Sequence, residues 1–473
     1  MTKVTRRQFL QHSKQLGIGA SVGATLLTHP GRAKAVSPNE KPVLGIVGIR
    51  GRGHLLAMGF ALRGDCEIAY MADVDSRVFE TSASKGYMRF TPPDLGALPR
   101  PEGVARAQGR APKCVSDFRR VLDDKSVDAI VTGTPDHWHA LVTVWSCQAG
   151  KDVYVEKPAS QNPWEGRKMV EAARKYERVV QLGTQSRSAP YMKKAKEYIE
   201  NGELGDIHMC RVYNQKIWGN RPAVDDGDPP EGLDWNMWNG PAPEARYNFN
   251  YWEHWNHFWR YSGGDSINDS IHQYDLARWL CNVRHPKSVY STGGRWAEEG
   301  VFDTPDTQMA VYDFDKLVMT FEMTLFTPYM LLADQELRDG DIFPHWPQNA
   351  SRIELYGTKG LMIVGRHGMG WQVFGRPHQR KPVVVAQEYG RWSDEPHRDD
   401  FLDAVRNRRR SNADIEEGHL STLLPQYANI SYRLGGEKLV VDPKTERFTN
   451  SEAGNALLRR EEYRKPWVIS DPV

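Results

Sequence analysis

The chain has 473 residues, of which 40% are hydrophobic, so it is long enough for two domains with cores of their own. Its 62 lysines and arginines nearly balance its 60 aspartates and glutamates. This balance provides no field that attracts nucleic acid or anionic lipid, and neither is expected as a partner. The five cysteines show no CxxC spacing, so neither a disulfide framework nor a zinc site is predicted.

The first 35 residues have the features of an export signal. Arg6-Arg7 precedes an apolar stretch over residues 16–27, and Ala33-Lys34-Ala35 offers a small-residue cleavage site. The paired arginines resemble a twin-arginine signal, which predicts export of the folded protein to the periplasm or another extracytoplasmic space. The apolar stretch is short and glycine-rich, so no stable membrane span is expected after cleavage. A basic, disordered tail is the alternative.

Residues 42–185 alternate between strands and helices, which predicts a Rossmann domain with a doubly wound parallel sheet. Strands are expected at Val43–Val47, Glu67–Ala72, Ala129–Thr132, Val153–Val155 and Val179–Leu182. Helices are expected at His54–Leu62, Leu141–Ala149 and Trp164–Tyr176. The excursion over residues 79–112 is rich in Pro, Gly and Arg and is predicted to be an irregular lid or surface insertion.

The pattern changes over residues 186–445, where a helix at Pro190–Asn201 precedes longer β-rich stretches. These stretches are Ile207–Gln215, Ser288–Thr292, Thr307–Phe314, Leu317–Thr324 and Ser351–Gly357. They predict an α+β domain with an open, mostly antiparallel sheet. Helices are again expected at Phe401–Arg406 and Leu420–Leu434, and residues 446–473 are expected to form a C-terminal tail.

The glycine-rich loop after the first strand predicts a dinucleotide site. Its sequence, Gly48-Ile49-Arg50-Gly51-Arg52-Gly53, lets backbone N–H groups approach a pyrophosphate at a helix N-terminus. Asp73 ends the next strand, where a carboxylate accepts hydrogen bonds from a ribose 2′-OH and repels a 2′-phosphate, which favours NAD over NADP. Arg50 stands where GxGxxG has its second glycine, so a phosphate contact by Arg50 or Arg52 stays open. A glycine-rich turn without a ligand is the alternative.

Two further strand ends carry polar side chains. Thr134-Pro135-Asp136-His137-Trp138-His139 follows one strand and is expected to line the cofactor crevice. Its two histidines have no partner at metal-ligand spacing, so no metal site is predicted. Glu156-Lys157-Pro158 ends the next strand, where a lysine can hydrogen-bond a substrate hydroxyl and favour the alkoxide as hydride leaves. A surface salt bridge is the alternative role for an isolated lysine.

Together these motifs resemble the glucose-fructose oxidoreductase/inositol dehydrogenase (Gfo/Idh/MocA) family, over essentially the whole chain after the signal. Later segments that carry the resemblance are Gly183-Thr184-Gln185-Ser186-Arg187, Gly263-Gly264 through Asn268, His272 and Asp275, Gly357-Thr358-Lys359-Gly360, Asn412-Ala413-Asp414-Ile415-Glu416, and Gly418-His419. The resemblance implies that the Rossmann domain binds the dinucleotide. It also implies that the second domain supplies the substrate site and often the oligomer contacts, so a homodimer or homotetramer is expected.

The resemblance further implies roles for single residues. Lys157 matches the family's catalytic or substrate-positioning lysine, and His272 matches its general acid/base histidine. Position 268 is often Asp in the inositol dehydrogenase type; Asn268 can orient a hydroxyl but cannot carry a proton, which leaves His272 as the expected base. The residues expected to bind the cofactor are Gly48, Ile49, Arg50, Gly51, Arg52, Gly53, Asp73, Thr134, Pro135, His139, Glu156, Lys157 and Gln185.

The predicted function is therefore hydride transfer between NAD and a secondary hydroxyl of a sugar, glycoside or polyol. Six tryptophans in residues 216–262 favour a saccharide, because indole faces stack on sugar C–H faces; packing of an insertion or subunit interface is the alternative. These are Trp218, Trp235, Trp238, Trp252, Trp255 and Trp259. Two other functions stay open: a redox-neutral, NAD-dependent glycosidase, and a non-catalytic sugar- or dinucleotide-binding protein.

Overall fold

The computed structural model describes residues 41–473 except for 84–90, 217–220, 298, 328–349 and 367–369. The predicted export signal and Trp218 therefore lie outside the described residues. The described residues belong to one compact unit. None of the helices in this part of the chain is both long enough and apolar enough to cross a membrane.

A six-stranded sheet forms the N-terminal domain, with the strand order β3-β2-β1-β4-β5-β6. Its strands are β1 (Val43–Val47), β2 (Glu67–Ala72), β3 (Lys113–Val115), β4 (Ala129–Thr132), β5 (Asp152–Val155) and β6 (Val180–Leu182). Every neighbouring pair is parallel. This is the strand order of the Rossmann fold, so the predicted doubly wound sheet is confirmed.

Helices cover both faces of this sheet, because its strands carry apolar side chains on both. The helices are α2 (Arg52–Ala61), α5 (Arg100–Gln108), α6 (Arg119–Asp123), α7 (Asp136–Gln148) and α8 (Pro163–Lys175). Successive side chains of a strand point to opposite faces. Leu44 and Ile46 of β1 accordingly pack in the cluster with α2 and α5, whereas Val47 packs with α6, α7 and α8.

The prediction of an irregular excursion over residues 79–112 was wrong for the part that is described. This region contains α4 (Pro93–Gly96) and the nine-residue helix α5, which ends at Gly109 in the left-handed conformation with φ +79°. Val104 is the only buried apolar residue of α5, so no apolar periodicity marks the helix in the sequence. The short elements β3 and α6 were not predicted either.

A ten-stranded sheet forms the second domain, with the order β14-β13-β12-β11-β7-β10-β9-β8-β15-β16. The strands are β7 (Ile207–Gln215), β8 (Ser288–Gly294), β9 (Thr307–Phe314), β10 (Leu317–Thr324), β11 (Arg352–Gly357), β12 (Leu361–Gly365), β13 (Trp371–Phe374), β14 (Val384–Glu388), β15 (Leu439–Asp442) and β16 (Arg447–Phe448). Only β7 and β10 pair in parallel. The predicted open, mostly antiparallel sheet is confirmed, although β12 to β16 were not predicted.

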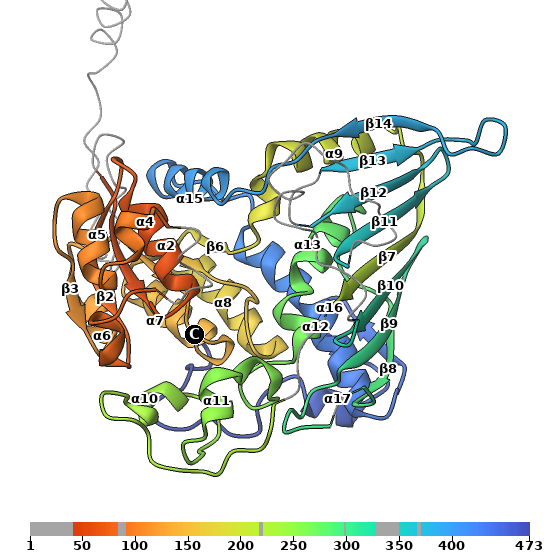
Figure 1. The fold of residues 1–473 in the computed structure, drawn as a ribbon. Helices are drawn as coiled ribbons and strands as arrows, with labels where there is room; N and C mark the ends of the chain where they lie inside the picture. Colours follow the sequence, from red (N-terminus) through yellow and green to blue (C-terminus); the bar gives the residue numbers. More distant parts are fainter. Residues whose placement is uncertain (1–40, 84–90, 217–220, 298, 328–349, 367–369) are drawn as a thin grey trace, which may run out of the picture. The chain divides into compact units, whose positions relative to one another are not determined.

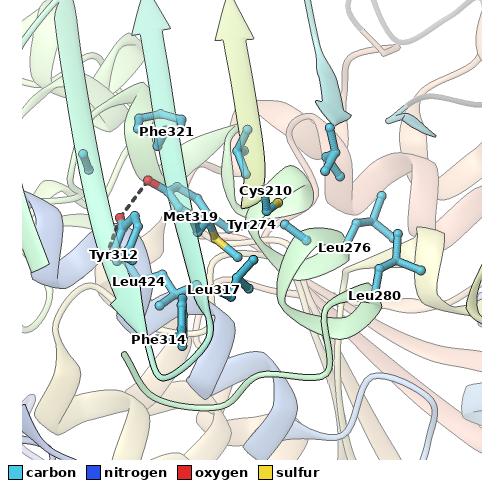
Figure 2. Close-up of a cluster of buried hydrophobic side chains, with 14 of the residues drawn as sticks. Cys210, Tyr274, Leu276, Leu280, Tyr312, Phe314, Leu317, Met319, Phe321 and Leu424 are labelled. Carbon is cyan, nitrogen blue, oxygen red and sulfur yellow. Dashed lines mark hydrogen bonds between the residues drawn. The ribbon is translucent and has the colours of Figure 1, made fainter. Parts of the chain in front are cut away.

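Helices on one face of this sheet position the second half of the candidate site. Figure 1 shows α13 (Ile271–Leu280) and α16 (Ile415–Arg433) along that face, and α9 (Pro190–Glu200) also packs there. Figure 2 shows Tyr274 of α13 close to Met319 of β10 in a buried cluster. The hydroxyl groups of Tyr274 and Tyr312 are hydrogen-bonded at 2.8 Å. This core fixes α13, whose second residue is His272.

Segments from late in the sequence return to the N-terminal domain. Phe401 of α15 (Glu395–Asn407) packs in the same cluster as α2, and Trp467 packs in the cluster of α7. Residues 446–473, predicted as a tail, also form β16 and α17 (Glu452–Ala456). The domain boundaries proposed after residues 185 and 445 stay predictions, and apolar packing crosses both.

Candidate active site

The carboxyl ends of β1, β2, β4 and β5 border a cavity of about 640 Å³. This volume is within the range of small-molecule and cofactor sites. Ten of the predicted site residues line it: Gly48, Arg50, Gly51, Arg52, Asp73, Thr134, Pro135, Glu156, Lys157 and Asn268. Five predicted residues are not part of its lining: Ile49, Gly53, His139, Gln185 and His272.

Three glycines make close backbone approaches at the turn from β1 to α2: Gly48 and Gly53 belong to this turn, and Gly133 approaches it from the end of β4. Gly48 has φ +76°, a conformation that other residues rarely adopt. A Cβ atom on Gly53 would lie 1.7 Å from the carbonyl oxygen of Gly48, and one on Gly133 would lie 2.7 Å from the backbone nitrogen of Gly53. No side chain caps the N-terminus of α2. The first N–H groups of this helix therefore lack a side-chain acceptor and are open to an anionic group.

Asp73 joins this loop to the end of β2. Its Oδ2 atom accepts the N–H of Ile49 at 2.8 Å, and its Oδ1 atom accepts the N–H of Asp75 at 3.0 Å. Burial raises the pKa of Asp73 to about 6, although these two hydrogen bonds act in the opposite direction. The carboxylate thus shapes the glycine loop as well as facing the cavity.

Arg100 donates a hydrogen bond to the glycine loop and was not predicted as a site residue. Its guanidinium donates to the carbonyl oxygens of Val78 and Thr81 at 3.1 and 2.8 Å, and to that of Arg50 at 3.0 Å. It is 4% exposed and lines the cavity. Its position at the start of α5 explains why the sequence did not reveal it, since α5 itself was not predicted.

The two arginines of the glycine loop both pair with carboxylates of the protein. Arg52 contacts Glu156 at 2.8 Å and Asp394 at 2.6 Å. Arg50 instead pairs with Glu253, the last residue of α11 (Phe249–Glu253), and its guanidinium lies 3.8 Å from the ring centroid of Trp252. Arg52 is therefore held inside the protein, whereas Arg50 links the loop to the insertion over residues 216–262.

Lys157 is held in place by Asn268, the last residue of α12 (Asp265–Asn268). Its Nζ atom donates to the backbone oxygen of Asn268 at 2.6 Å and to the Oδ1 atom at 3.1 Å. An ammonium group has three N–H donors, so one remains for a ligand. Burial lowers the pKa of Lys157, while the carboxylates of Asp269, Asp136 and Glu156 raise it.

His272 lies near the same charges at the start of α13. Burial lowers its pKa well below the usual value, and the positive charges of Arg366 and Lys157 lower it further, whereas Asp269 raises it. The imidazole is therefore neutral near pH 7, which is the form that accepts a proton. Asp275, on the next turn of α13, forms a buried ion pair with Arg187 at 2.8 Å and so fixes this helix rather than facing the cavity.

Three of the predicted residues support the cavity wall. Glu156 accepts hydrogen bonds from Arg52 at 2.8 Å and from Gln185 at 3.3 Å. The ring nitrogens of His139 contact the carbonyl oxygens of Pro158 and Thr134 at 2.7 and 2.8 Å. Among the residues that the structure describes, no group of three His, Cys, Asp or Glu side chains is arranged to hold a metal ion.

Asp136 lines the cavity but was not singled out as a site residue. It is the first residue of α7, which begins five residues earlier than predicted. The prediction missed this start because its polar and aromatic side chains, which are buried, do not form an apolar pattern. The hydroxyl of Ser262 donates to its Oδ2 atom. Burial raises the pKa of Asp136 to about 7, whereas the charge of Lys157 lowers it.

The tryptophans of the insertion divide between packing and the cavity. Trp235 and Trp238 stack with ring centroids 4.6 Å apart, and the backbone oxygen of Trp238 accepts the indole N–H of Trp138 at 2.9 Å. These contacts fix the insertion on the N-terminal domain. Trp238, Trp252 and Trp255 line the cavity. Packing therefore explains Trp235 and part of the role of Trp238, while stacking of the cavity-lining tryptophans on a saccharide stays a prediction.

Three segments of the chain match models of one protein family. Residues 98–184 match the NAD-binding Rossmann fold of an oxidoreductase family, and residues 192–363 match the GFO/IDH/MocA C-terminal domain. Residues 384–469 match the C-terminal alpha/beta domain of the same oxidoreductase family. Together these segments account for most of the chain, and the N-terminal domain is an NAD-binding Rossmann domain.

The chain is also similar to named dehydrogenases. It is 30% identical to levoglucosan dehydrogenase of Pseudarthrobacter phenanthrenivorans over 52% of this chain and 58% of that protein. It is 25% identical to myo-inositol 2-dehydrogenase of Thermotoga maritima over 59% of this chain and 65% of that protein. The chain thus matches less than two thirds of the length of these relatives.

A solved structure has the same fold. A levoglucosan dehydrogenase in complex with NADH and levoglucosan superposes with a TM-score of 0.59 at 18% identity. The superposition covers 85% of this chain and 99% of that one. At this identity the likeness establishes the fold, with its two domains, and nothing finer.

Proposed function

Because the chain belongs to the Gfo/Idh/MocA oxidoreductase family, we propose that it is an NAD-dependent oxidoreductase that acts on a secondary hydroxyl of a sugar, glycoside or polyol. The observation that carries this proposal is Lys157, which Asn268 holds at the wall of the cavity that the glycine loop borders. The relatives named levoglucosan dehydrogenase and myo-inositol 2-dehydrogenase support this substrate class.

The residues around the glycine loop fit a dinucleotide. The approach of Gly53 to Gly48 leaves no room for a side chain, and the uncapped start of α2 offers N–H groups to a pyrophosphate. The Asp73 carboxylate lines the cavity where a ribose 2′-OH can donate to it, and its charge repels the 2′-phosphate of NADP. When bound, NAD supplies the hydride acceptor or donor of the reaction.

The roles proposed for the protein side chains follow from their charges. The third N–H of Lys157 donates to the oxygen of the substrate hydroxyl and stabilises the negative charge that develops there. His272, neutral near pH 7, takes the proton from the hydroxyl oxygen as the hydride leaves the carbon that bears this oxygen. Asn268 orients Lys157 through its two oxygen atoms. In the reverse direction His272 returns the proton to the carbonyl oxygen.

One observation supports a second function, a redox-neutral glycosidase that keeps its NAD through many turnovers. The contacts of Arg50 with Glu253 and Trp252 connect the glycine loop to the insertion at the edge of the cavity. We expect a connection of this kind to slow the exchange of a bound dinucleotide. Such an enzyme releases sugar from a glycoside without added cofactor and without net formation of NADH.

The test begins with mass spectrometry of the dinucleotide that co-purifies with the full chain, followed by a screen of polyols, sugars and glycosides. NADH formation identifies the dehydrogenase, and sugar release without added NAD identifies the glycosidase. Lys157→Met and His272→Gln are each expected to lower turnover by about 100-fold or more. Lys125→Met and His208→Gln, at exposed positions, are the matched controls. NAD binding without any turnover would leave a binding protein and contradict the enzymatic proposal.

We also propose that the protein is exported in its folded state. The support is the Arg6-Arg7 pair, the apolar stretch behind it and the small residues at 33–35. Because NAD is made in the cytosol, folded export would allow the cofactor to be bound first. A fusion of residues 1–35 to a reporter that is active only after twin-arginine export tests this, with Arg6-Arg7→Lys-Lys as the control that must block transport.

A homo-oligomer is proposed as the state of the protein in solution. Met309, Val311 and Val318 are 49%, 40% and 43% exposed on the face of the large sheet that is turned away from α13 and α16. Exposed apolar residues that gather on one sheet face are typical of an interaction surface. Light scattering of the purified chain measures the oligomeric state, and a monomer at micromolar concentration would contradict the proposal.

A further inference from the structure

Asp136 and Lys157 come from neighbouring strand ends and face the same cavity. Asp136 begins α7 after β4, and Lys157 follows β5, the adjacent strand. Both side chains line the cavity, and that of Asp136 is only 1% exposed. The carboxyl ends of parallel strands meet at one edge of the sheet, so this proximity is built into the fold.

The carboxyl group of Asp136 has few partners. Its Oδ2 atom accepts the hydroxyl of Ser262, and its Oδ1 atom is buried without a hydrogen bond to any described residue. Lys157 is the charged side chain that acts on this carboxyl group. Ser262 lies on the same short segment as Asn268, which holds Lys157. The segment from Ser262 to Asn268 therefore holds both Asp136 and Lys157.

The other carboxylates near Lys157 already face arginine or lysine. Glu156 forms an ion pair with Arg52 at 2.8 Å. Asp269 forms ion pairs with Lys216 and Arg366. Asp136, in contrast, accepts a hydrogen bond from a neutral hydroxyl. Of the three acids, Asp136 is the one for which the described residues provide no ion pair with an arginine or another lysine.

We propose that Asp136 is a positioning residue of the active site that keeps Lys157 in its ammonium form. Burial lowers the pKa of a lysine because it disfavours the charged form, and each nearby carboxylate counteracts this effect, so the loss of one carboxylate weakens the hold of the lysine on its proton. A neutral amine can act as a base but stabilises an oxyanion far less well than an ammonium group. Asp136 thereby makes Lys157 a hydrogen-bond donor to the substrate oxygen. This last step rests on the function proposed above, whereas the coupling of the two charges does not.

The titration of the two groups is consistent with this coupling. Burial raises the pKa of Asp136 to about 7, and Lys157 acts against that rise. Burial lowers the pKa of Lys157; Asp269, then Asp136 and then Glu156 act against that fall, while Arg366 adds to it. The remaining charge-bearing neighbour, His272, is neutral near pH 7. Above pH 7 Asp136 is ionised, which is the range in which Lys157 needs its support.

The test measures the protonation of Lys157 directly and needs no turnover. The full chain, with and without NAD, is labelled with limiting acetic anhydride between pH 6 and 11, and the acetylation of Lys157 is followed by mass spectrometry. Only the neutral amine reacts. In Asp136→Asn the apparent pKa of Lys157 is expected to fall by at least one unit, so that its labelling at a pH below both pKa values rises by about tenfold. The exposed Lys125 is the internal reference, and Asp94→Asn, at an exposed position, is the matched control.

A second variant covers the case in which Asp136→Asn does not fold. Ser262→Ala keeps the carboxyl group but removes its hydroxyl donor, which raises the pKa of Asp136 and weakens its support of Lys157. The apparent pKa of Lys157 is then expected to fall by a smaller amount. An unchanged titration of Lys157 in the variants that fold overturns the proposal. A changed titration in a protein that turns over no sugar or polyol supports the coupling and contradicts the proposed function.

Discussion

At the scale of single residues, burial disfavours the charged forms of the acids and bases in and beside the cavity. It raises the pKa of Asp73 to about 6 and that of Asp136 to about 7, and it lowers the pKa of Lys157 and His272. In each case the charged form is disfavoured by removal from water. Ligand binding and turnover are therefore expected to change with pH between about 5 and 8, where an exposed carboxylate does not titrate.

Asp73 gives a pH prediction with a definite sign. Above pH 6 its carboxylate accepts the N–H of Ile49 and, in the proposed complex with NAD, a ribose hydroxyl, whereas below pH 6 protonation removes an acceptor. The affinity for NAD is therefore expected to fall as the pH falls through about 6. Because its folded-state pKa is raised, Asp73 also costs folding stability as the pH rises from about 4 through 6. Fluorescence titration with NAD from pH 5 to 8 measures the affinity.

The matched comparison uses two Asp→Asn variants. Asp73→Asn is expected to give a flatter pH profile of NAD affinity, because its side chain does not titrate in this range. Asp94→Asn, at an exposed position, is expected to keep the native slope. If Asp73→Asn retained the native slope, another group would be responsible for it.

At the scale of elements, the turn between β1 and α2 depends on the absence of side chains. Gly53→Ala places a Cβ atom 1.7 Å from the carbonyl oxygen of Gly48, so the turn has to open. We expect a loss of about 1–3 kcal/mol in unfolding free energy and a large loss of NAD affinity. Gly64→Ala is the control, because its Cβ atom would meet nothing within 4 Å. Chemical denaturation and NAD titration measure the two effects, and equal behaviour of the two variants would contradict this role.

The link from the glycine loop to α11 makes a second prediction at this scale. Glu253→Gln removes the ion pair with Arg50 but leaves the contact of Arg50 with Trp252. A half-exposed ion pair contributes about 0.2–1 kcal/mol, so NAD is expected to dissociate about 1.4 to five times faster. The double variant Glu253→Gln with Trp252→Ala should dissociate from NAD faster still, because it also loses the contact between Arg50 and the indole ring. Stopped-flow chase of bound NAD measures the rate, and Glu231→Gln, exposed in the same insertion, is the control that should leave it unchanged.

At the scale of the whole molecule, the two domains share their cores. Trp467 is 3% exposed and packs with α7 in the N-terminal domain, more than 280 residues after that domain's last strand by sequence. Phe401 of α15 fills the opposite face of the same sheet. The hydrophobic core of the N-terminal domain therefore includes side chains from the C-terminal end of the sequence.

Replacement of the buried Trp467 is therefore expected to destabilise the N-terminal domain. Trp467→Ala is expected to lower the unfolding free energy by about 3–5 kcal/mol, as for other buried aromatic residues. Trp296→Ala, at a position that is 71% exposed, should change it by less than about 0.5 kcal/mol. Thermal and urea denaturation measure both. A small effect at Trp467 would show that residues 446–473 are the independent tail that the sequence predicts.

Features that are encoded by residues close together in the sequence could be predicted from local patterns. Most strands of the first sheet and the first five strands of the second have apolar patterns, and the glycine loop, Asp73 and Lys157 stand at strand ends, so their positions in the fold followed from the sequence. The family resemblance rests on the same short motifs. Polar elements such as α5 escaped prediction, because their burial depends on partners elsewhere in the chain, and Arg100 was missed with them.

The sequence by itself determined the Rossmann fold, the open second sheet, the family and the NAD-binding domain, since each is written in short-range patterns. Only the tertiary structure decided how the charges of the site are paired. Arg50 forms an ion pair with Glu253, Arg52 forms ion pairs with Glu156 and Asp394, and Asp136 and Lys157 line the same cavity. These partners are far apart in sequence, and a charge depends on its distance to other charges and on its burial. Both quantities exist only once the chain has folded.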